Sequence, residues 1–218
     1  NLIIFCNKKS KLSSFDLSKS ELDFIKKQWS DKKEIVAINQ YTRLVFAVNP
    51  KQEKDTNKHF ECLRLLGDQL QGSLKDEAAV MIIDVKGNQK EVLAVAEGMA
   101  LSNYTFTKHK TDPKAHKLKS IYLEKTIDTK DIEELQNIVD AVYFTRDLIN
   151  EPFSHLTAKD LAEAAVKSGK TNGFKTTVFN KKKIESLKMG GLLAVNKGSI
   201  DEPTFTIMEW KPKNAKNK

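Results

Sequence analysis

Short runs of β-branched and aliphatic residues alternate, over the first 123 residues, with segments whose apolar positions recur at helical spacing. Each run is five to seven residues long, which is typical of strands. Strands that alternate with helices of ordinary length predict an α/β fold, with a central mixed sheet flanked by helices. The predicted strands are Leu2–Cys6, Glu34–Ile38, Thr42–Val48, Ala78–Ile83 and Lys119–Leu123.

Three helices are expected between these strands. Ser18 and Glu21 have the spacing of a capping box, and apolar residues follow them at helical intervals. A second helix contains Phe60 and is expected to close near Gly72, while a third covers Gln89–Asn103. These helices complete the first layered domain.

The composition of the chain changes after the third helix. Residues 106–119 are polar and basic and contain a proline, so we expect an exposed loop there. Thr129 is predicted to cap a long helix that ends at Asn150, because Pro152 disfavours helical backbone in the residue before it. This long helix is expected to connect two domains.

A second α/β region follows the break at Pro152. Thr157 and Asp160 are predicted to form a capping box on a helix that ends at Ser168-Gly169. Gly190-Gly191 suggests a tight turn or a close backbone approach ahead of a buried strand. The other expected elements are a strand at Lys175–Phe179, a short helix at Lys182–Leu187, strands at Leu192–Val195 and Thr204–Trp210, and a fraying tail, KPKNAKNK.

Composition indicates a globular protein, with 39% hydrophobic and 30% charged residues. No apolar run approaches the roughly 18–20 residues of a membrane span, and two cysteines are too few for a disulfide framework, so we expect reduced thiols in a cytoplasmic protein. The net charge of +8 comes almost wholly from lysines that lie among acidic neighbours. This favours a solvated surface over nucleic-acid binding, which the charge alone does not exclude.

No familiar catalytic or metal-binding motif is present. The four histidines, His59, His109, His116 and His155, have no metal-ligand spacing, and P-loop, GxGxxG and GxSxG patterns are absent. His109 and His116 flank one loop, where solvated histidines are far commoner than metal ligands. The carboxylates Glu133, Glu134 and Asp140 lie on a polar helix face, where solubility and capping explain them.

Arg146 and Asn150 are four residues apart, so they share one face of the long helix. An arginine in this place can bind a substrate carboxylate with two hydrogen bonds. It can equally fasten the helix end, while Asn150 satisfies the last open carbonyls. The structural role is favoured, and neither residue identifies a reaction.

Three segments resemble one family when taken in order. EGMALSNYTFTKHKT (97–111), RDLINEPFSHLTAKDLAEAA (146–165) and MGGLLAVNKGSIDEPTFTIMEWKP (189–212) appear in the order and approximate spacing of the cytosolic leucyl aminopeptidases, peptidase family M17. The resemblance covers 97–212; before it, only the α/β texture agrees. It implies an N-terminal domain, a connecting helix and a catalytic α/β domain, in a hexamer. It also implies two divalent ions, zinc or manganese, that polarise the scissile carbonyl and activate water.

The family's metal ligands and catalytic groups lie in VGKG- and NTDAEGR-type segments, which have no counterpart here. We therefore expect no catalytic, cofactor-binding or metal-binding residue in this chain, and no bound metal. The resemblance divides the chain into an N-terminal domain (1–128), a connecting helix (129–152) and the beginning of a catalytic domain (153–218). The implied function is that of the N-terminal portion of a leucyl aminopeptidase acting on peptides, inactive alone and serving domain junction and oligomerisation. The alternative is a non-catalytic binding module, possibly for DNA through its lysines.

Overall fold

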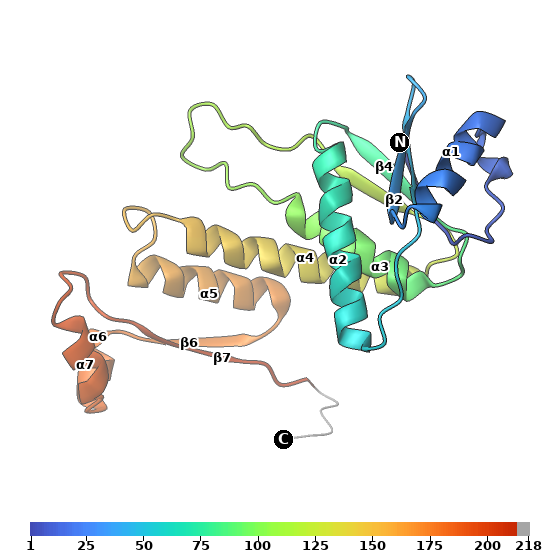
Figure 1. Ribbon diagram of the computed structural model, residues 1–218. Helices are drawn as coiled ribbons and strands as arrows, with labels where there is room; N and C mark the ends of the chain where they lie inside the picture. Colours follow the sequence, from blue (N-terminus) through green and yellow to red (C-terminus); the bar gives the residue numbers. More distant parts are fainter. Residues whose placement is uncertain (213–218) are drawn as a thin grey trace. The chain divides into compact units, whose positions relative to one another are not determined.

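The computed structural model describes residues 1–212, and the chain divides into two compact units, 1–144 and 145–218 (Figure 1). The tail that we expect to fray falls, from residue 213 onward, outside the described residues. No helix of the described part is long and apolar enough to cross a membrane.

The first unit holds a five-stranded sheet in the order β2-β3-β1-β4-β5. β1 runs parallel to β3 and β4, β4 runs parallel to β5, and β2 is antiparallel to β3, so the sheet is mixed as predicted. The elements are β1 (Leu2–Phe5), the 3-10 turn η1 (Ser13–Phe15), α1 (Lys19–Ser30), β2 (Ile35–Asn39), β3 (Leu44–Val48), α2 (Thr56–Leu74), β4 (Ala79–Asp84), α3 (Gln89–Ser102), β5 (Ser120–Leu123) and α4 (Thr129–Asn150), which continues into the second unit.

The central strand β1 has helices on both faces because its side chains alternate between them. Ile4 and Cys6 belong to the core that includes Ile25 and Trp29 of α1. Ile3 and Phe5 point to the opposite side and join the core that includes residues of α2 and α3. Because both faces are covered, β1 reads as a continuous apolar run rather than an alternating one.

The helices α2 and α3 cross at two glycines. A Cβ atom built on Gly98 would lie 2.1 Å from the backbone oxygen of Arg64, and one built on Gly67 would lie 2.2 Å from the backbone oxygen of Val95. Backbone therefore meets backbone at this crossing. Neither glycine needs an unusual φ, so each serves close packing rather than a turn.

The second unit contains a two-stranded antiparallel sheet in which Lys175 pairs with Glu209 and Phe179 with Phe205. The helix α5 packs against both strands. Several large apolar side chains remain exposed in this unit, among them Ile200 (100%), Val195 (86%) and Trp210 (72%). Its elements are α5 (Ala158–Asn172), β6 (Lys175–Phe179), α6 (Lys181–Ser186), α7 (Gly190–Asn196) and β7 (Phe205–Glu209).

Both predicted capping boxes are confirmed. The Ser18 hydroxyl accepts a hydrogen bond from the backbone N–H of Glu21, while the Glu21 carboxylate accepts one from the backbone N–H of Ser18. Thr157 and Asp160 form the same reciprocal arrangement at the start of α5. At α4 the predicted cap is wrong by one residue: Thr129 is already helical, and the Asp128 carboxylate accepts the N–H of Lys130.

Two predictions based on glycines are wrong. α5 continues past Gly169 to Gly173, which adopts the left-handed backbone (φ 75°) of a helix end. Gly169 instead allows β6 to approach, because its Cβ would lie 2.4 Å from the hydroxyl oxygen of Thr176. Gly72 lies two residues before Leu74, the last residue of α2, so the prediction that this helix closes near Gly72 is confirmed. Its position has open space around the missing Cβ.

Gly190-Gly191 is the second wrong prediction, because this pair opens the helix α7 instead of preceding a strand. No atom lies within 4 Å of a Cβ built on either residue, so no close backbone approach requires them. The N–H of Leu192 donates to the carbonyl of Met189, which starts a helical turn. The run Leu192–Val195 is therefore helical and not a buried strand.

Candidate functional site

The residues singled out from the sequence do not converge on a metal site. Among residues 1–212, no group of three or more His, Cys, Asp and Glu side chains is placed to hold a metal ion. The His116 ring nitrogen Nδ1 lies 2.8 Å from the amide nitrogen of Gln71, whereas the His109 ring lies against Phe106 at 6.3 Å between centroids. The two loop histidines thus have separate surroundings.

The helix break at Pro152 is confirmed. α4 ends at Asn150, and the backbone N–H groups of His155 and Leu156 then donate to the Pro152 carbonyl, which forms a turn before α5. Arg146 is half-buried on the last turns of α4, and Asn150 is exposed. Their role as fasteners of this junction stays a prediction.

The N-terminal ends of α2 and α3 are joined by a buried polar cluster. His59 Nε2 lies 3.1 Å from Glu91 Oε1, and Lys86 Nζ lies 2.5 Å from Glu91 Oε2. The His59 Nδ1 accepts the backbone N–H of Glu53, which leaves Nε2 as the donor to Glu91 in the neutral ring. Each member of the cluster therefore has a partner.

The pKa of Glu91 reflects this arrangement. Burial acts to raise it, but hydrogen bonds from Lys86 and His59, together with the charge of Lys86, outweigh burial and hold the pKa below its ordinary value. Glu91 also lies in the first turn of α3, where the helix dipole favours a negative charge. A fully partnered carboxylate of this kind ties elements together and is not available as a base.

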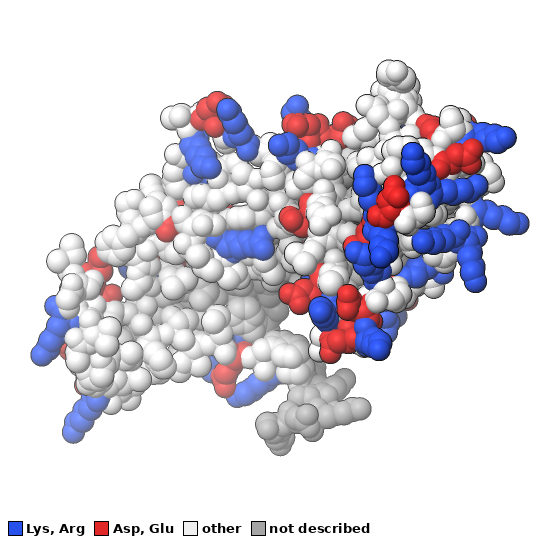
Figure 2. Space-filling view, viewed as in Figure 1, with Lys and Arg blue, Asp and Glu red and all other residues white. Residues whose placement is uncertain are grey.

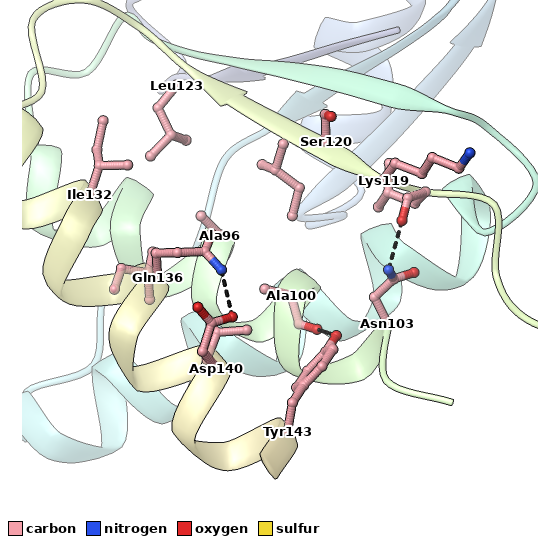
Figure 3. Close-up of a pocket in the computed structure, with 14 residues that line it drawn as sticks. Ala96, Ala100, Asn103, Lys119, Ser120, Leu123, Ile132, Gln136, Asp140 and Tyr143 are labelled. Atoms are coloured by element: carbon pink, nitrogen blue, oxygen red, sulfur yellow. Dashed lines mark hydrogen bonds between the residues drawn. The ribbon is translucent and has the colours of Figure 1, made fainter. Parts of the chain in front are cut away.

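A cavity of about 240 Å³ lies in the first unit under α4, between α3 and β5 (Figure 3). Several of its polar side chains are engaged: Gln136 donates to Asp140 across 2.8 Å, and Asn103 donates to the carbonyl of Leu118, also across 2.8 Å. The Tyr143 hydroxyl donates to the carbonyl of Ala100. Lys119, Ser120 and apolar side chains such as Ile132 complete the wall.

The second unit contains a cavity of about 420 Å³ beside α5 and the start of β7. Lys159 and Glu163 of α5, Asn180 after β6, and Glu202 contribute its polar groups. The Thr204 hydroxyl donates to the carbonyl of Ala158 across 3.0 Å, which fixes the segment before β7 against the helix. No sequence motif indicated this cavity, because its walls come from residues about 40 positions apart.

Comparison with known proteins finds a family match for residues 143–218, which include the second unit. A family model described as "Cytosol aminopeptidase family, catalytic domain" matches residues 143–218. A probable cytosol aminopeptidase of Chlorobaculum parvum is 63% identical over 73 residues, covering 34% of this chain and 14% of the relative. A probable cytosol aminopeptidase of Sulfurihydrogenibium sp. is 35% identical over 146 residues, covering 62% of this chain and 29% of the relative.

Two solved structures share the fold of nearly the whole chain. A mutant of tomato leucine aminopeptidase matches with a TM-score of 0.78 and 18% identity, covering 100% of this chain and 49% of that chain. The bottromycin maturation enzyme BotP in complex with Mn matches with a TM-score of 0.75 and 17% identity, covering 97% of this chain and 45% of that chain. The match thus spans less than a third of the length of these curated relatives and about half of these solved chains.

The architecture defines a two-unit α/β protein, with a helix-flanked mixed sheet first and a smaller α/β unit second. The solved structures agree with that fold over both units. Residues 143–218 match the catalytic domain of the cytosol aminopeptidase family, and the two aminopeptidase relatives are similar to this chain over 34% and 62% of its length.

Proposed function

We propose that the protein to which this chain belongs is a metal-dependent aminopeptidase that removes N-terminal residues such as leucine from peptides. The observation that carries the proposal is the catalytic-domain match over residues 143–218, with 63% identity to one curated aminopeptidase. The manganese in the BotP complex supports divalent-metal dependence in this proposal. Zinc is the other candidate metal, and two ions are expected from the family resemblance.

The metal ligands are proposed to lie outside this chain. The described residues do not fit a metal centre, since no group of three or more suitable side chains comes together between residues 1 and 212. We therefore assign to this chain the N-terminal domain (1–128), the connecting helix (129–152) and the first part of the catalytic domain (153–218). Its exposed apolar residues, such as Val195 and Trp210, support a second unit that packs against further protein.

The experiment compares two proteins on one substrate. The product of the full gene and the 218-residue chain are each incubated with leucine p-nitroanilide and Mn²⁺ or Zn²⁺, and release of p-nitroaniline is followed. We expect metal-dependent turnover by the full product and none by the chain. A full product that is inactive with both metals would refute the aminopeptidase proposal, whereas turnover by the chain would refute only the assignment of its metal ligands.

Oligomerisation and location are part of the same proposal. A hexamer, with contacts supplied partly by this chain, is tested by light scattering of the full product, where a monomer would contradict it. A cytoplasmic location is supported by the names of the relatives and is tested by cell fractionation. Recovery in the membrane or secreted fraction would refute it.

Nucleic-acid binding is the second candidate, favoured by the distribution of charge. Lysine and arginine side chains crowd the side of the first unit that carries α1, with some acidic side chains among them (Figure 2). A role of this kind predicts an affinity for duplex DNA that falls steeply as salt rises. Filter binding between 50 and 200 mM salt tests it, and an affinity that does not respond to salt would exclude a phosphate-backbone contact.

A further inference from the structure

A cavity of about 300 Å³ opens at the carboxyl edge of the sheet in the first unit. Lys8, which follows β1, lines it together with Lys32 and Lys33 from the end of α1. Asn49 and Lys51, which follow β3, form another part of its wall, and Trp29 of α1 completes it. We call this feature the lysine cavity.

The fold places the lysine cavity where parallel α/β sheets commonly bind ligands. β1 and β3 are neighbours and run parallel, so their carboxyl ends lie at one edge of the sheet. The chain leaves β1 toward α1 on one face and leaves β3 toward α2 on the opposite face, as the two separate cores show. Connections that diverge in this way leave a crevice outside the carboxyl ends of the strands.

The charge of the cavity is strongly positive. Four lysines and one glutamate, Glu34, line it. Glu34 lies 3.5 Å from the Lys51 ammonium and accepts the backbone N–H of Lys51, so this carboxylate is engaged by one lysine. Lys8, Lys32 and Lys33 form no ion pair with any residue that the structure describes. Lys32 and Lys33 follow the C-terminus of α1, where the helix dipole is equivalent to about half a negative charge. The positive charge of the two lysines exceeds what is needed to balance this dipole.

Trp29 contributes a buried aromatic side chain to the wall of the lysine cavity, where its emission can report on a bound ligand. Its side chain is 4% exposed, and its Nε1 is a buried donor with no hydrogen-bond partner among the described residues. Because Nε1 has less than 1 Å² of accessible surface, it does not face the open cavity. The half-buried Asn49 side chain in the same wall likewise has no hydrogen-bond partner in the described part of the chain.

We propose that the lysine cavity binds a small polyvalent phosphate anion, with pyrophosphate as its simplest representative. The three ammonium groups of Lys8, Lys32 and Lys33 supply the attraction, while the Asn49 amide is a donor for a phosphate oxygen. The cavity has the size of the smaller ligand sites in proteins. The limited volume of the cavity, about 300 Å³, favours a small anion over the backbone of a duplex, which contacts mainly exposed side chains.

The test uses Trp29 as the reporter. The chain has two tryptophans, so Trp210→Phe leaves Trp29 alone, and its emission is followed while pyrophosphate is added to the 218-residue chain. We expect a saturable change. Lys33→Gln is expected to weaken binding roughly threefold to tenfold, and Lys8→Gln/Lys33→Gln further still. The matched controls, Lys27→Gln and Lys19→Gln/Lys27→Gln, remove the same charge from α1 outside the cavity and are expected to change the affinity less than twofold.

Lys32→Gly guards against misfolding as an explanation. Lys32 has a left-handed backbone (φ 62°), which glycine adopts without strain, so this variant removes one charge and keeps the fold. It is expected to lose affinity while its thermal transition stays at or above that of the parent. Three results would overturn the proposal: no saturation, an equal loss in the matched controls, or binding of a duplex oligonucleotide without binding of pyrophosphate.

Discussion

The crossing of α2 and α3 gives the sharpest test of the packing. Gly98→Ala places a methyl group 2.1 Å from the backbone oxygen of Arg64, with two further Arg64 backbone atoms at 2.7 Å. Backbone cannot rotate out of the way as a side chain can, so the two helices must separate. Separation opens gaps among the side chains of the core that both helices share, which includes Leu63 and Met99.

Two opposing effects set the magnitude. Overpacking a core costs about 1–3 kcal/mol, and alanine in place of a helical glycine contributes about 0.5–1 kcal/mol in favour of the fold. The cost exceeds the gain, so we expect Gly98→Ala to lose about 1–2 kcal/mol, or roughly 3–8 °C in thermal midpoint. Gly72→Ala is the control, because it lies inside α2 with nothing within 4 Å of the new methyl group. It is expected to gain about 0.5–1 kcal/mol.

Urea titration separates these expectations. Trp29 is buried in the first unit, so its emission in a Trp210→Phe background reports the unfolding of that unit. Gly98→Ala is expected to unfold at lower urea than the parent, and Gly72→Ala at higher urea, with similar slopes. If Gly98→Ala proves as stable as Gly72→Ala, the close backbone contact between α2 and α3 does not exist.

Three further predictions concern single groups. Glu91→Gln is expected to lower the free energy of unfolding by about 3 kcal/mol at neutral pH, because it breaks a buried ion pair. The folded pKa of Glu91 lies below its ordinary 4.5, so the carboxylate contributes its full stabilisation above pH 4.5 and loses it as the pH falls. In an acid titration below pH 4.5, the variant should therefore lose less stability than the parent. Burial raises the pKa of Cys6 to about 12, outweighing the effect of its hydrogen bond to Val48. A thiol reagent at pH 8 should therefore modify the half-exposed Cys62 and reach Cys6 only after unfolding. Rapid modification of both thiols would contradict the burial of Cys6. Thr157→Ala removes the cap of α5 and is expected to cost the second unit about 1 kcal/mol, measured by circular dichroism, whereas an unchanged transition would show that the cap contributes nothing.

Local patterns predicted most of the first unit. All five strands lie within two residues of their predicted bounds, because each is a short apolar run bounded by polar residues. The Ser18 and Thr157 caps could also be predicted from local sequence, because the donor and the acceptor of each cap are three residues apart. The chain therefore encodes these features in neighbouring residues, and no tertiary information is needed to find them.

The errors arise at glycines whose role cannot be told from the neighbouring sequence. Gly169 looks like a helix end in sequence, yet it is kept by the approach of Thr176, whose position depends on the turn at Gly173. At Gly190 the following apolar run is only four residues long, a length at which strand and helix patterns cannot be told apart. A glycine alone does not reveal which neighbour, if any, it accommodates.

The polar clusters were missed for a related reason. His59 and Glu91 are 32 positions apart, and the lysine cavity collects residues that follow β1, α1 and β3. Only the sheet order brings such residues together, and sequence spacing does not state that order. Trp29 is one of the apolar residues that follow the Ser18 cap at helical spacing, and it lies in the core, but its unsatisfied N–H becomes visible only once its surroundings are known.

The two proposals rest on different parts of the chain, so they can fail independently. The aminopeptidase proposal depends on residues 143–218, which carry the family match, and the lysine cavity depends on residues 8–51 of the first unit. Lys33→Gln is therefore expected to leave peptide hydrolysis by the full gene product unchanged when no phosphate anion is present. If added pyrophosphate alters hydrolysis by the parent but not by this variant, the cavity is coupled to the active site. If it alters both equally, the effect comes from chelation of the metal and says nothing for the cavity.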